Sequence, residues 1–86
     1  LTAYVLESGA RLADAIRAPE AAVVLWSAGE RQRQRIGVPM PPPDAVERTE
    51  ILDRLAETLG DDTFNRARAR GDAMSSDEAR RFALDL

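Results

Sequence analysis

The amino-acid sequence predicts an all-α fold, a short array of about five helices whose last helices form a C-terminal cap. Three observations predict it. Apolar residues recur at steps of three and four along most of the chain. Glycine, proline and side-chain cap signals divide this pattern into segments. No segment alternates apolar and polar residues with the β-branched side chains typical of strands. The expected helices span residues 3–17, 20–36, 44–59, 62–70 and 76–85.

The first expected helix carries apolar residues on more than one side. Its main stripe consists of Val5, Gly9, Leu12 and Ile16. Tyr4 and Leu6 lie on a neighbouring flank, as expected for a helix packed between two layers. Exposed apolar surface drives association, so a homodimer through residues 3–17 is one expectation. Glu7 and Arg11 stand four residues apart, in the order that favours an ion pair within the helix.

The second expected helix begins near Pro19 and ends at Gly37, because proline fits the first turn and glycine the left-handed C-terminal cap. Trp26 flanks its apolar stripe. Two readings of Trp26 stay open, a core side chain or an anchor for a partner, since tryptophan is enriched in binding hot spots. The segment E-R-Q-R-Q-R at 30–35 is polar throughout, so we expect it to project into solvent or toward a partner.

The remaining helices are delimited by local cap signals. Four prolines stiffen the connector 38–43, in which Met40 is expected to pack against the helices. Asp44, with Glu47 three residues later, predicts the start of the third helix, and Gly71 the end of the fourth. Ser75 and Glu78 have the spacing of a capping box for the fifth helix. The side chains expected to be most buried are Leu52, Leu55, Leu59, Phe64 and Phe82.

The composition restricts the possible chemistry. The chain has 86 residues, which suffices for a single small helical domain over 1–86. All twelve basic residues are arginine, and histidine, lysine and cysteine are absent. This excludes a Ser-His-Asp triad, a lysine-containing phosphate loop and zinc sites built from Cys and His. We therefore predict no catalytic residue, no cofactor and no metal site.

The charge and hydropathy patterns bear on partners and location. The net charge of −3 has the wrong sign for a nucleic-acid binder. No apolar run approaches the ~18 residues of a membrane helix, so we expect no membrane segment and a cytoplasmic location. The chain starts with Leu1 rather than methionine, and we expect it to be a fragment of a larger protein.

Four stretches carry a family resemblance: A-A-V-V-L-W-S-A-G-E, R-I-G-V-P-M-P-P, L-A-E-T-L-G-D-D-T-F and A-R-A-R-G-D-A-M-S-S-D-E-A. In order and spacing they resemble the C-terminal helical region of large bacterial regulators. These regulators combine an ATPase module with tetratricopeptide-like (TPR-like) repeats and often a LuxR-type DNA-binding domain. The resemblance implies the end of a TPR-like solenoid, a non-catalytic interaction or regulatory module in a cytosolic signalling ATPase or transcriptional regulator. It implies a protein partner or neighbouring domains of the same chain. The ATPase motifs are not in this sequence, so no nucleotide-binding residue follows.

The candidate partner-contact surface combines the apolar flank of the first helix with the second helix: Tyr4, Leu6, Trp26, Arg31 and Arg35. An alternative of another class is a helix-turn-helix DNA-binding module built from 62–70 and 76–85. Its recognition helix would open with Asp77 and Glu78, where DNA phosphates would approach. We therefore do not expect this chain to bind nucleic acid.

Overall fold

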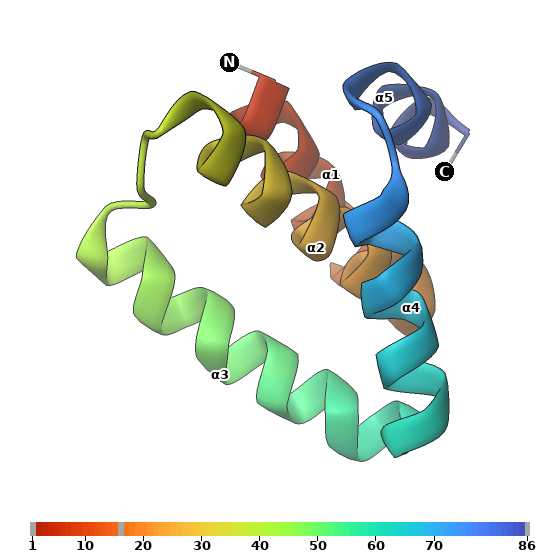
Figure 1. The fold of residues 1–86 in the computed structure, drawn as a ribbon. Coiled ribbons are helices and arrows are strands. Elements are labelled where there is room, and N and C mark those ends of the chain that lie inside the picture. The colour runs from red at the N-terminus through yellow and green to blue at the C-terminus, as the bar shows by residue number, and fades with distance from the viewer. Residues whose placement is uncertain (1, 16, 86) are drawn as a thin grey trace.

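A computed structural model of the chain describes the backbone of residues 2–15 and 17–85, and the side chains of residues 6–13, 15 and 17–85. The described residues form five helices and no strand, which confirms the predicted all-α class (Figure 1). The helices are α1 (Thr2–Ala15), α2 (Pro19–Ile36), α3 (Pro42–Leu59), α4 (Asp61–Ala73) and α5 (Ser76–Leu84).

Helix α2 is the centre of the fold. Its residues 22–29 are all buried, on every side of the helix, as expected for a helix enclosed by others. α1 and α4 pack most extensively on it, and α5 packs on α1 and α2. α3 touches α2 and α4 more sparingly and stands apart from the other helices in Figure 1. The helices therefore surround one central member, and α3 is the most peripheral long helix.

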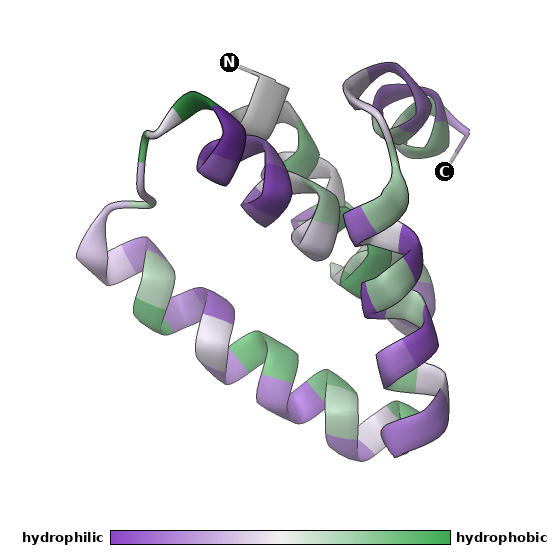
Figure 2. Cartoon of the chain, viewed as in Figure 1, coloured by the Kyte–Doolittle hydropathy of each residue, from purple (hydrophilic) through white to green (hydrophobic). Residues whose placement is uncertain are grey.

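The local cap signals account for several helix ends. Gly37 adopts a left-handed conformation with φ of 70°, and its backbone N–H donates to the Arg33 carbonyl, as predicted. The Ser75–Glu78 capping box is present in full at the start of α5. Met40 in the proline connector is buried, which confirms its predicted packing. Figure 2 shows the polar end of α2 leading into this connector.

Three predicted helix ends are wrong. α1 ends at Ala15 rather than at residue 17, and Arg17 adopts a left-handed backbone conformation with φ of 62°. α3 begins at Pro42 rather than Asp44, because proline is preorganised for the first turn and Asp44 falls within that turn. α4 continues through Gly71 to Ala73. A Cβ atom at Gly71 would lie 2.2 Å from the Val24 carbonyl oxygen and 2.7 Å from the Ser27 Cβ. Gly71 therefore serves a close backbone approach of α4 to α2 and does not end the helix.

The buried face of α1 also differs from the predicted stripe. Leu6, Ala10 and Ala13 are buried, whereas Leu12 is 53% exposed. The Val5 side chain and Ile16 lie outside the described residues. The two alanines present little bulk, and the distance between packed helices depends on the side chains at their contact. α1 therefore turns its alanine face toward the core.

The core is centred on α2 rather than on α3. Leu52 and Leu55 are buried as predicted, but Leu59, Phe64 and Phe82 are only partly buried at the edge of the core. The largest fully buried side chains instead come from α2 and α1: Trp26, Leu6, Leu25, Val23 and Val24. The prediction for the three edge residues was wrong because the core is built around α2, whose residues 22–29 are all buried, and these three side chains pack only against its edge.

Candidate functional site

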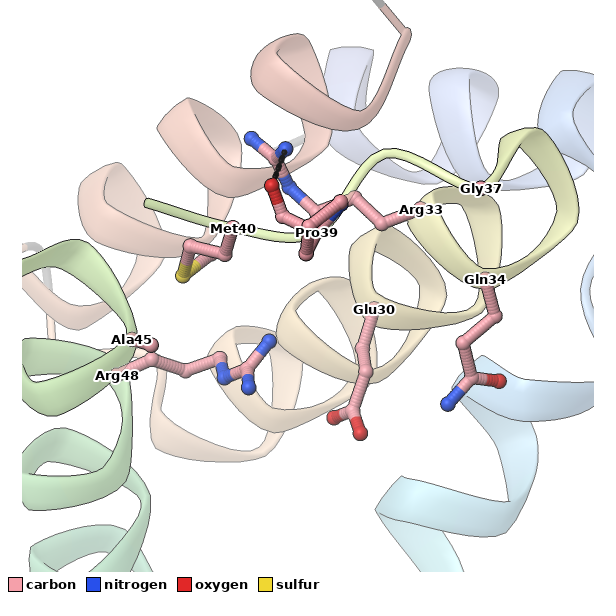
Figure 3. Close-up of a pocket in the computed structure, with 8 residues that line it drawn as sticks. All are labelled: Glu30, Arg33, Gln34, Gly37, Pro39, Met40, Ala45 and Arg48. Carbon is pink, nitrogen blue, oxygen red and sulfur yellow. Dashed lines mark hydrogen bonds between the residues drawn. The ribbon is translucent and has the colours of Figure 1, made fainter. Parts of the chain in front are cut away.

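An open cleft of about 490 Å³ lies between the second half of α2, the proline connector and the first turns of α3 (Figure 3). Pro39, Met40 and Ala45 supply its apolar lining, and the other residues are mainly charged or polar. The full lining is Glu30, Arg33, Gln34, Gly37, Pro39, Met40, Ala45 and Arg48. The cleft exists because the stiff connector leads α3 away from α2 before α3 returns toward α4.

The guanidinium of Arg33 is engaged in contacts with the elements that surround the cleft. Its Nε donates to Oε2 of Glu7 at 2.5 Å, and its Nη2 donates to Oε1 at 2.8 Å. Its Nη1 lies 3.4 Å from the carbonyl oxygen of Pro39. The hydrogen bond to Glu7 raises the pKa of Arg33 above its ordinary value, and the nearby negative charge adds to this. Arg33 thus joins α1, α2 and the connector.

A second hollow of about 280 Å³ lies between α2, α3 and α4 and shares Glu30 and Arg48 with the cleft. Its other lining residues are Thr49, Leu52, Asp53, Phe64 and Arg68. Arg68 of α4 donates from Nη2 to Oε2 of Glu30 at 3.3 Å. This ion pair fixes the carboxylate of Glu30 between the two hollows.

Arg48 has no hydrogen-bond or ion-pair partner within the described part of the chain. Its side chain is half-buried and extends from α3 into the cleft, toward the wall formed by α2 (Figure 3). A guanidinium group offers a planar set of donors that matches a carboxylate or a phosphate. The arrangement can therefore bind an anionic group beside an apolar one.

The predicted contact residues do not lie together in the structure. Leu6 and Trp26 are buried in the core, so the prediction that they form a contact surface was wrong. Their burial follows from the central position of α2 and the alanine face of α1. Arg31 and Arg35 are exposed near the end of α2, as predicted, and the Tyr4 side chain lies outside the described residues. None of these five residues lines the cleft.

The ring of Trp26 is covered by the guanidinium of Arg11 and does not face a partner. The Arg11 guanidinium carbon lies 5.1 Å from the centre of its ring, a cation–π contact. Arg11 also donates from Nε to Oε1 of Glu47 on α3 at 2.9 Å. The predicted Glu7–Arg11 pair is thereby replaced by two pairs between helices.

Sequence reasoning did not single out Arg48, and it considered Glu30 only as part of the polar segment 30–35. Arg48 is one of twelve arginines in the chain, and nothing in its local sequence distinguishes it. Its position becomes notable only when the partners of the other arginines are known. The cleft residues with a sequence signal were Met40, an apolar side chain among prolines, the helix cap Gly37, and the polar segment 30–35, which supplies Glu30, Arg33 and Gln34.

The basic side chains of α4 are partly engaged within the fold. Arg68 binds Glu30, and the Arg70 guanidinium carbon lies 4.9 Å from the centre of the Phe82 ring. At the start of α5, Asp77 accepts a hydrogen bond from Arg80 at 2.5 Å. α5 itself packs on α1 and α2.

Comparisons with protein-family models, with curated proteins and with solved structures find no match to this chain. Among the described residues, no group of three or more acidic, histidine or cysteine side chains is placed to hold a metal ion. Within the same residues, no helix has both the length and the apolar character needed to span a membrane.

Proposed function

We propose that this chain is a non-catalytic helical protein-interaction module and that the cleft between α2 and α3 is its contact site. The observation that carries the proposal is the pairing of an apolar lining, formed by Met40 and Ala45, with the guanidinium of Arg48, which has no partner among the described side chains. Protein interfaces combine apolar centres with polar rims, and arginine is enriched in them. Met40 adds a flexible side chain that can adapt to a partner's shape.

The proposed setting is regulatory. The resemblance of the four quoted stretches to bacterial regulators favours a module in a cytosolic signalling ATPase or transcriptional regulator. In that setting the cleft would receive either a separate protein or a neighbouring domain of the same chain. A homodimer is a further form of such contact, but Leu6 is buried and would not contribute to it.

A nucleic-acid partner fits the geometry less well. DNA and RNA binders neutralise several phosphates at once, and their affinity depends steeply on that number. Here two of the arginines lining the hollows, Arg33 and Arg68, are already paired with glutamates. The chain also carries a net charge of −3.

Site-specific photo-crosslinking in the full-length protein, in its native cell, tests the proposal. A photoreactive amino acid replaces Gln34, an exposed residue at the cleft, or Arg81, an exposed control residue on α5. Mass spectrometry then identifies the crosslinked peptides, whether they belong to another protein or to another part of the same chain. We expect a discrete product from position 34 and none from position 81. Equal yields at both positions, or no product at position 34, would contradict the proposal.

A further inference from the structure

We infer that the cleft binds an acidic side chain of a partner segment and that Arg48 pairs with its carboxylate. The inference rests on the proposed function and names the chemistry of the partner. Four arginines of the described chain are half-buried: Arg11, Arg33, Arg48 and Arg68. Three of them each pair with a glutamate from another helix. Arg48 is the exception among the four.

The surroundings of Arg48 favour an external partner. A charged group that is partly removed from water is stabilised by pairing with an opposite charge. The guanidinium of Arg48 points across the cleft rather than along the outer surface of α3 (Figure 3). The glutamate on the facing wall, Glu30, is already bound by Arg68 at 3.3 Å. A carboxylate that enters the cleft would give Arg48 an ion-pair partner, as the other three arginines have.

The charge of the lining favours a single negative charge over a phosphate. Arg33 is neutralised by Glu7, and Arg68 is paired with Glu30. Arg48 thus contributes the one cation of these hollows that has no paired anion among the described residues. Asp53 lines the adjoining hollow and would repel a dianion, as would Glu30. A glutamate or aspartate side chain matches this balance better than a phosphorylated residue does.

The apolar lining of the cleft indicates which kind of side chain lies next to the acidic residue in the partner segment. Met40 and Ala45 line the cleft close to the origin of Arg48 on α3, and Pro39 lines it beside Arg33 (Figure 3). A partner segment would gain from burying an apolar side chain there while its carboxylate reaches Arg48. The expected ligand is therefore a peptide segment in which an acidic residue neighbours an aliphatic one.

Three blocked peptides of one length test the chemistry: Gly-Leu-Glu-Leu-Gly, the same peptide with glutamine, and the same peptide with phosphoserine at the central position. Each is titrated into the isotope-labelled chain, and backbone amide shifts are followed by NMR. We expect the glutamate peptide to shift amides around Met40 and Arg48. The glutamine peptide should bind about tenfold more weakly, as the loss of a charge-assisted hydrogen bond implies. Equal binding of these two peptides, no binding of the glutamate peptide, or tighter binding of the phosphoserine peptide would overturn the inference.

Two variants test whether the preference for the glutamate peptide depends on Arg48. Arg48→Gln should remove the preference for glutamate over glutamine, whereas Arg81→Gln, the same change at an exposed site on α5, should keep it. Circular dichroism confirms that both variants fold. The crosslink from position 34 separates this inference from the proposed function. A crosslink that persists unchanged in Arg48→Gln would overturn the role of Arg48 and leave the cleft as a contact site, whereas its absence in the wild type would overturn both.

Discussion

Arg33 of α2 and Glu7 of α1 form a two-point ion pair across 26 residues of sequence, with distances of 2.5 and 2.8 Å. Glu7 is almost fully buried, and Arg33 is mostly buried. The same guanidinium approaches the carbonyl oxygen of Pro39. One side chain therefore ties the first helix, the central helix and the connector together beside the cleft.

Removing Glu7 should destabilise the fold strongly. Glu7→Ala leaves the Arg33 guanidinium in a poorly hydrated site without its carboxylate, and breaking a buried pair in this way costs about 3–5 kcal/mol. The free energy of unfolding, measured by urea titration, should fall by that amount.

Two further variants control this prediction. Glu47→Ala breaks the more exposed pair with Arg11 and should cost less than about 1 kcal/mol. The double variant Glu7→Leu, Arg33→Met should be more stable than Glu7→Ala, because it removes both charges. Equal costs for Glu7→Ala and Glu47→Ala would show that burial does not strengthen the Glu7–Arg33 pair.

Gly71→Ala should destabilise the chain although alanine is the better helix former. The added Cβ would lie 2.2 Å from the Val24 carbonyl oxygen, so α4 would have to move away from α2. Overpacking of this kind costs about 1–3 kcal/mol, measured by chemical unfolding. Gly9→Ala is the matched control, because its Cβ would meet Ala83 at 3.3 Å and Leu25 at 3.4 Å. A Gly71→Ala variant as stable as Gly9→Ala would contradict the close approach of α4 to α2.

Leu55→Ala should lower the free energy of unfolding by about 2–5 kcal/mol, the usual range for a buried leucine. Leu55 is 3% exposed, whereas Val46 on the same helix is 59% exposed. Val46→Ala should therefore change stability by less than about 0.5 kcal/mol. Urea midpoints of the two variants give the comparison. Similar midpoints would mean that α3 does not pack through Leu55.

Leu6→Glu should unfold the chain rather than merely weaken an association through α1. Leu6 is buried, and a carboxylate at its position would lose its hydration without gaining a cation to pair with. Leu12→Glu, on the half-exposed side of the same helix, should leave the helical circular dichroism spectrum intact. Sedimentation of the Leu12 variant also tests the expected homodimer through residues 3–17. A folded Leu6→Glu variant would contradict the observed face of α1.

The capping box at α5 should respond to acid. The Ser75 backbone N–H donates to Glu78 at 3.0 Å, and this bond is the main cause that lowers the pKa of Glu78 from its ordinary value of 4.5. A lowered pKa in the folded state means that the carboxylate contributes stability above 4.5 and loses it as the pH falls below that value. The protection of the amides of residues 75–79, that is, their exchange rate corrected for the intrinsic effect of pH, should fall as the pH drops from about 4.5 to about 3.

Glu78→Gln is the control for this pH response. Glutamine can also accept the Ser75 N–H hydrogen bond, but it does not titrate in this range. The acid-dependent part of the exchange should therefore disappear in the variant. An identical response of wild type and Glu78→Gln would assign the effect to another carboxylate.

The sequence alone determined the features that depend on neighbouring residues. The five helices, the cap at Gly37 and the Ser75–Glu78 box were all predicted, because each is built from residues within one or two turns. Met40 was predicted to be buried because an apolar side chain in a stiff connector has few alternatives. The burial of the aromatic side chains was predicted less well, because their apolar character alone does not determine which helix lies at the centre of the fold.

Only the tertiary structure decided which residues meet across the fold. Glu7 was predicted to pair with Arg11 four residues away, yet it pairs with Arg33 on another helix. Gly71 has the same local signal whether it ends a helix or admits a neighbouring backbone, and α2 decided the outcome. The cleft, and the position of Arg48 within it, likewise depend on where α3 lies relative to α2. The physical reason is that burial and charge pairing are set by groups far apart in sequence, whereas helix capping is set by groups close together.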